Sequence, residues 1–129
     1  MKIKNKIDFK SLYENNLNSF IAWNDHHVNM INRLNAQMKN YRGKIYLFGG
    51  HITTQFYIAF GLSTDKIEGV LDNDPFKHGK RVGGTDLKIF PPSILGREEE
   101  TAIIIPQSPY AEEIKKGILE NHNKIVFWE

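Results

Sequence analysis

Cysteine is absent from the 129 residues of this chain, and long apolar runs are absent as well. Without cysteine, the chain can form neither a disulfide nor a thiolate metal site. No apolar stretch approaches the roughly 18 residues that a membrane-spanning helix requires, and the basic N-terminus lacks the apolar run of a signal peptide. The sequence therefore predicts a cytoplasmic protein with no membrane partner.

A strong charge of either sign is also lacking. The chain carries 17 basic and 15 acidic residues, which gives a formal net charge of +2. Nucleic-acid-binding domains usually show a clustered basic excess, so this balance argues against a nucleic-acid partner. The local clusters, lysines at positions 2, 4, 6 and 10 and glutamates at 98–100, are typical of a basic tail and a solvated turn.

The remaining composition is that of a globular protein. Apolar residues make up 40% and charged residues 25% of the chain, and its length suits one domain. We expect a helical lead-in over residues 1–40, with the first seven residues frayed, and a Rossmann-like nucleotide-binding domain over residues 41–129. The two are expected to form a single compact unit.

Apolar residues recur at three- and four-residue spacings between residues 8 and 40. This pattern predicts an amphipathic helix, either continuous or broken near residues 24–27. Asp8 is a suitable N-cap, and Gly43 follows the segment. We interpret the apolar stripe, Trp23 included, as core. Its members are Leu12, Leu17, Phe20, Ile21, Trp23, Val28, Ile31 and Leu34.

Strand-like and helical segments alternate in the rest of the chain. Strands are expected at residues 44–48, 67–71, 87–90, 101–105 and 124–128, and helices at 53–60 and 109–119. Ser93 is expected to cap a brief helical turn. This alternation implies right-handed βαβ units. The predicted fold class is α/β, a Rossmann-like three-layer domain with a mostly parallel sheet of about five strands, preceded by a long helical segment.

Ligands of such sheets bind beyond the carboxyl ends of the strands, where this chain has two glycines, the start of a helix and several polar side chains. The glycines permit a tight turn, and the helix start offers N–H groups to a phosphate. Asp72 follows Gly49 by about the 20 residues expected of an acid that binds ribose. We predict a nucleotide site formed by Gly49, Gly50, His51, Asp72, Asn73, Lys77, Gln107 and Ser108.

The dinucleotide fingerprint G-x-G-x-x-G is incomplete. His51 and Thr54 stand at its second and third glycine positions, which argues against bound NAD. The loop at residues 72–85 supplies Lys77, Lys80 and Arg81, whose side chains can contact phosphate.

The histidines do not form a metal motif. His26 and His27 face different sides of the predicted helix, and no metal-ligand spacing occurs, so no metal site is predicted. His51 is the candidate catalytic residue, as a general base. We interpret His122 as a surface turn residue, and Tyr46 and Trp128 as packing residues.

Several segments resemble the C-terminal domain of sugar C-methyltransferases, which use S-adenosylmethionine to methylate nucleotide-linked deoxysugars. They are residues 45–51 (IYLFGGH), 70–80 (VLDNDPFKHGK), 84–85 (GT), 87–89 (LKI) and 108–114 (SPYAEEI). The most specific is D-x-x-P-x-K-x-G at residues 72–79, followed by Gly84 and Thr85. The chain departs from the family pattern at Leu47, near Thr53 and at Gly83, where family members usually carry glycine, lysine and proline.

The resemblance carries expectations about function. In that family the domain packs on the methyltransferase domain and helps to enclose the sugar nucleotide, while the methyl donor binds in a separate, preceding domain. It therefore implies a bacterial nucleotide-sugar-binding or accessory module in deoxysugar or surface-polysaccharide synthesis. Its ligand would be a nucleotide diphosphate sugar. The chain would hold no cofactor itself, and S-adenosylmethionine would bind only where a partner domain supplies the site.

Two other functions stay open at this point. One is a small enzyme that modifies a sugar nucleotide, with His51 and Asp72 as proton-transfer groups. The other is an interaction domain whose helical lead-in docks a methyltransferase partner chain or a second copy of itself as a homodimer.

Overall fold

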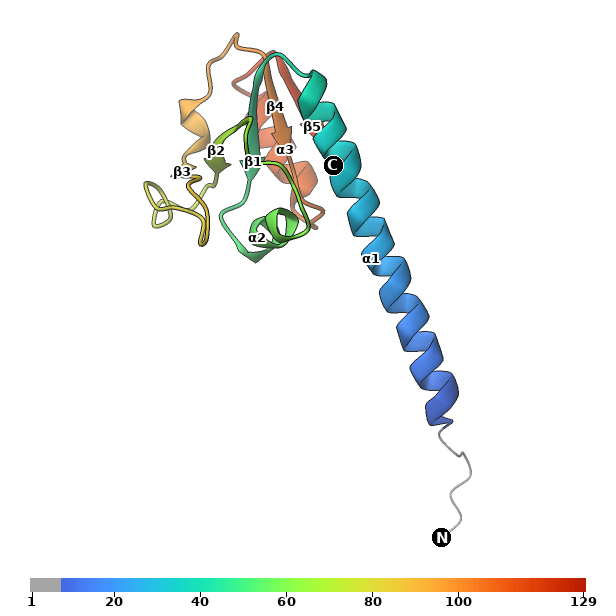
Figure 1. The fold of residues 1–129 in the computed structure, drawn as a ribbon. Coiled ribbons are helices and arrows are strands. Elements are labelled where there is room, and N and C mark those ends of the chain that lie inside the picture. Colours follow the sequence, from blue (N-terminus) through green and yellow to red (C-terminus); the bar gives the residue numbers. More distant parts are fainter. Residues whose placement is uncertain (1–7) are drawn as a thin grey trace.

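A long N-terminal helix leads into the globular body (Figure 1). The structure is a computed structural model that describes residues 8–129, so the fraying expected of residues 1–7 lies outside it. Helix α1 (Phe9–Asn40) is continuous, which decides between the two predicted alternatives. The carboxylate of Asp8 accepts a hydrogen bond from the backbone N–H of Ser11 at 3.2 Å, which confirms Asp8 as the N-cap.

Five parallel strands form one sheet in the order β3-β2-β1-β4-β5. From β1 the chain moves outward to β2 and β3, and then returns to the other side of β1 for β4 and β5. The switch point therefore lies between β1 and β4, as in Rossmann-like folds. The predicted α/β class is confirmed. The strands are β1 (Lys44–Phe48), β2 (Ile67–Leu71), β3 (Ile89–Phe90), β4 (Thr101–Ile104) and β5 (Ile125–Trp128).

Helices cover both faces of the sheet. Along β1, Ile45 and Leu47 point to the face covered by α1 and α2 (Ile52–Ala59). Tyr46 and Phe48 point to the face covered by α3 (Ala111–Leu119). This alternation gives the three predicted layers, because successive side chains of a strand lie on opposite faces.

The segment before β3 differs from the prediction. We expected a strand over residues 87–90, but β3 holds only Ile89 and Phe90. Lys88 instead forms an antiparallel bridge with Arg81, and the Val82 N–H donates to the Leu87 carbonyl at 2.9 Å. The loop thus folds back on itself before it joins the sheet.

The turn after β3 also differs. The short 3₁₀ helix η1 (Pro92–Ile94) begins after Pro91, so Ser93 lies inside the turn rather than capping it. Proline fixes φ near the value that a helical first turn needs, which explains why the turn starts there.

Only the second half of α1 belongs to the core. Met30, Ile31, Leu34 and Met38 are at most 5% exposed. The interpretation of the whole stripe as core was wrong, because the helix outruns the sheet: 32 residues of helix span about 48 Å, whereas a five-residue strand spans about 17 Å. The first half of α1 extends beyond the body (Figure 1). Its exposed apolar residues are Phe9, Leu12, Tyr13, Leu17, Phe20, Ile21 and Trp23.

The predictions for Tyr46 and Trp128 hold. Tyr46 is buried in the cluster under α3, and the ring of Trp128 packs edge-on against Tyr41 with centroids 5.1 Å apart. No helix within residues 8–129 combines the length and the apolar character needed to cross a membrane.

Leu34 offers a test of the docking of α1 on the sheet. Its side chain is fully buried, so we expect Leu34→Ala to lower the free energy of unfolding by about 2–5 kcal/mol. The same change at Leu119, an exposed residue of α3, should alter it by no more than about 0.5 kcal/mol. Urea unfolding of both variants measures the difference, and equal effects would contradict this packing.

Candidate functional site

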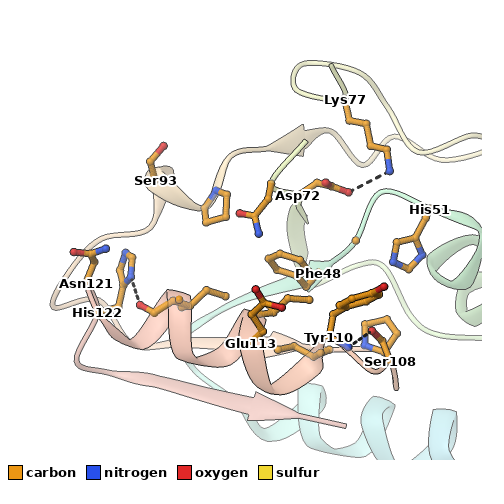
Figure 2. A pocket seen from close by; sticks show the side chains of 18 residues that line it. Phe48, His51, Asp72, Lys77, Ser93, Ser108, Tyr110, Glu113, Asn121 and His122 are labelled. Carbon is orange, nitrogen blue, oxygen red and sulfur yellow. Dashed lines mark hydrogen bonds and ion pairs between the residues drawn. The ribbon is translucent and has the colours of Figure 1, made fainter. Parts of the chain in front are cut away.

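A pocket of about 910 Å³ opens at the carboxyl ends of β1, β2 and β4, the edge that contains the switch point. This volume lies within the roughly 300–1,000 Å³ of typical ligand sites. The pocket continues over α3 toward the residues that follow that helix (Figure 2). Its polar and charged lining residues are His51, Asp72, Asn73, Lys77, Ser93, Ser108, Tyr110, Glu113, Asn121 and His122.

The turn after β1 depends on two glycines. Gly49 has φ +107°, a left-handed conformation that side chains other than glycine's rarely allow. A Cβ on Gly49 would also lie 2.2 Å from Nε2 of His51, and one on Gly50 would lie 2.7 Å from the Ile89 side chain. The chain can therefore turn sharply into α2 and bring its backbone to the pocket.

Asp72 is buried, and its carboxylate interacts with backbone N–H groups and with a lysine of the same chain. Oδ2 accepts the Gly50 N–H at 2.7 Å and lies 3.5 Å from Nζ of Lys77, while Oδ1 accepts the Asp74 N–H at 2.8 Å. Burial alone would raise the pKa of Asp72, but the two N–H donors and Lys77 outweigh it and lower the pKa. The carboxylate thus stays ionised and organises the turn. These engagements make it a poorer proton-transfer group than His51.

The start of α2 can bind an anion. His51 is its N-cap residue but makes no side-chain cap. The backbone N–H groups of His51, Ile52 and Thr53 have no hydrogen-bond partner among the described residues. Such N–H groups, together with the positive end of the helix dipole, form a natural phosphate site. Of these three residues His51 lines the pocket, together with Lys77, whereas Ile52 and Thr53 line the hollow between α1 and α2.

The surroundings of His51 favour its uncharged form. Loss of water contact, and then the positive charge of Lys77, lower the pKa of His51 against the opposing effect of Asp72. A neutral imidazole can donate one hydrogen bond and accept another. The ring can therefore bind a hydroxyl or a phosphate oxygen, or accept a proton.

The sequence pattern did not identify the end of the pocket that lies beyond α3, where Asn121 and His122 line it. His122 is partly buried there, and its two ring nitrogens lie 2.8 Å and 3.2 Å from the carbonyl oxygens of Ile118 and Leu95. Its interpretation as a surface turn residue was therefore wrong. The strand-end rule could not find His122 or Asn121, because α3 runs back across the sheet and places them away from the carboxyl edge.

Six of the eight predicted site residues line this pocket: Gly49, His51, Asp72, Asn73, Lys77 and Ser108. Gly50 lies behind the turn, bonded to Asp72, and Gln107 lines a second hollow between α1 and α2. Lys80 and Arg81 are not among the lining residues, and Arg81 instead lies 3.7 Å from the carboxylate of Asp86. Within residues 8–129, no group of three or more side chains is arranged to hold a metal ion.

Comparison with known proteins decides the family. The family described as the C-methyltransferase C-terminal domain matches residues 5–129. The chain belongs to this family. Neither the curated proteins nor the solved structures include a significant match. The match covers essentially the whole chain, so it includes α1 as well as the sheet of this C-methyltransferase C-terminal domain.

Asp72 makes the stability of the domain depend on pH. Its pKa in the folded chain lies below the ordinary value of 3.8, so its ionised form stabilises the fold at neutral pH. This contribution is lost as pH falls through the folded pKa. We therefore expect the wild type to be more stable than Asp72→Asn at about pH 7, with the difference shrinking toward about pH 3.

Urea unfolding at both pH values measures this difference. Asp25→Asn, which changes an exposed carboxylate of α1, serves as the control. A gap between the wild type and Asp72→Asn that is equal at both pH values would contradict the role assigned to the carboxylate.

Proposed function

We propose that this C-methyltransferase C-terminal domain binds a nucleotide diphosphate sugar and holds it for methylation by a catalytic methyltransferase domain. The methyl donor, S-adenosylmethionine, would bind to that catalytic domain. The setting we propose is deoxysugar or surface-polysaccharide synthesis in the bacterial cytoplasm.

One observation carries this proposal: the pocket joins an anion-binding end to a polar end. At the first end lie His51, the N-cap residue of α2, and Lys77. At the other, Ser93 and Asn121 offer hydroxyl and amide groups, and His122, held by the carbonyls of Ile118 and Leu95, lies beside them (Figure 2). A nucleotide diphosphate sugar has the matching chemistry, because it combines a doubly charged diphosphate with neutral polyhydroxyl groups.

The floor between these ends suits a ring. Phe48, Ile105 and Ile114 line the pocket with apolar surface, and Gly117 contributes no side chain. Apolar walls with a few placed polar groups are typical of ligand sites. The length of the pocket along α3 supports a ligand that extends from its phosphates by a ring and hydroxyl groups.

Lys77 provides the test of this site. An ammonium bonded to phosphate contributes roughly 1.5–3 kcal/mol, so we expect Lys77→Met to weaken binding of the diphosphate sugar by about tenfold to a hundredfold. Lys80→Met is the matched control, because Lys80 lies in the same loop and outside the pocket lining. Isothermal titration calorimetry with uridine and thymidine diphosphate sugars measures both.

A thermal-shift screen should come first to choose the sugar and base. Ligand at about 100 times its dissociation constant adds roughly 2.7 kcal/mol of stability, which raises the melting temperature visibly. Equal loss of affinity in Lys77→Met and Lys80→Met would indicate a general charge effect and contradict the site. No binding across uridine, thymidine, guanosine and cytidine diphosphate sugars would overturn the proposed function.

A further inference from the structure

The exposed half of α1 carries a ladder of four aromatic residues along one side. Phe9, Tyr13, Phe20 and Trp23, with Asn16 between them, follow alternating four- and three-residue spacings. Residues at these spacings lie on one side of a helix. The same ladder continues through His27 to Met30 and Leu34, which pack on the body. The face that is buried at one end of α1 is therefore exposed at the other.

The exposed ladder is large enough for an interface. Its four aromatic residues are 42% to 72% exposed. Since an aromatic side chain buries about 150–250 Å², they offer on the order of 500 Å² together. This is more than half of the roughly 800 Å² that each partner buries in a standard interface. Leu12 and Leu17 lie beside the ladder and add to this area.

The ladder is complementary to itself when two copies run antiparallel. The ladder has two kinds of position that alternate along the helix. In an antiparallel helix pair, a position of one kind on one helix faces a position of the other kind on its partner. Centring the pair on residue 18 places Phe9 of each copy at His27 of the other, and Tyr13 at Trp23. The pairing then covers residues 9–27 of both chains, and the two globular bodies lie at opposite ends of the helix pair.

Charge fits this pairing. Between residues 9 and 27 the described chain has three charged side chains, Lys10, Glu14 and Asp25. Glu14 and Asp25 lie away from the ladder, on the outer faces of the helix. Lys10 flanks the ladder and faces the segment of the second copy around Asn24, so no like charges meet.

A hollow lies at the position that the N-terminal end of α1 from the second copy would occupy. It has a volume of about 540 Å³, and Trp23, His27, Phe56 and Ile52 are among the residues that line it. The ring of Phe56 packs 5.3 Å from Trp23 and 5.8 Å from His27, centroid to centroid, which forms an aromatic wall. Phe9 of a second copy would reach this wall.

We propose that two copies of this chain associate through α1 as an antiparallel pair, with Phe9 of each copy inserted in the hollow beside Trp23 of the other. The arrangement is a two-fold isologous interface, the commonest kind in homo-oligomers. It does not depend on the pocket at the switch point, which lies on the body.

The molar mass of the chain in solution tests the pairing. Light scattering after size exclusion should give twice the chain mass of 14.9 kDa at micromolar concentrations. Phe20→Lys removes a central aromatic anchor and should raise the dissociation constant of the dimer at least about thirtyfold. Asn18→Lys is the matched control on the opposite face of α1, and it should leave the mass unchanged. Circular dichroism checks that both variants keep their helix.

Single cysteines test the direction of the pairing, because the chain has none of its own. Under mild oxidation, a mixture of Tyr13→Cys and Trp23→Cys chains should cross-link as the mixed pair. Cross-linking of Tyr13→Cys chains with one another would indicate a parallel pair and overturn the proposed arrangement.

A monomeric mass at all concentrations, or a dimer unaffected by Phe20→Lys, would overturn the pairing. The pairing would also be overturned if the chain alone is monomeric and a methyltransferase chain binds the ladder. Binding of a diphosphate sugar by Phe20→Lys separates this proposal from the function proposed above, because the sugar site should survive the loss of the dimer.

Discussion

Three segments of the chain meet on the carboxylate of Asp72. Its oxygens accept the N–H groups of Gly50 and Asp74 and lie beside Lys77, while its backbone carbonyl accepts a hydrogen bond from His78 at 2.6 Å. The end of β2 is thereby joined to the turn after β1 and to the loop that carries Lys77. The anion-binding end of the pocket depends on these bonds, since they fix both the start of α2 and the only lysine among the described lining residues.

Much of the fold could be predicted because local signals agreed with tertiary structure. The runs at β1 and β2 are apolar and end at glycine or aspartate, and both strands begin and end where expected. The prediction failed where the structure of a segment depends on residues outside its own local sequence. Residues 87 and 88 pair with residues 81 and 82 instead of extending β3. The apolar pattern of α1 likewise could not show that the sheet covers only one end of the helix.

The candidate site was predictable only along one edge. The rule that ligands bind at strand ends placed His51, Asp72 and Ser108 at one pocket, because the carboxyl ends of parallel strands share an edge. The rule could not show that the carboxylate of Asp72 organises the turn, because that role depends on hydrogen bonds that form only in the folded chain. Gln107 faces the other hollow although it is next to Ser108, because the segment after β4 passes between the two.

The turn after β1 also limits how this sequence can change. The imidazole of His51 occupies the space that a side chain on Gly49 would need. A residue other than glycine at position 49 would displace the ring as well as strain the backbone. His51 can be exchanged while Gly49 is kept, but Gly49 cannot be exchanged while His51 stays in place. The two positions therefore form one steric unit: a side chain at position 49 would require both a strained backbone and a rotated or smaller residue at position 51.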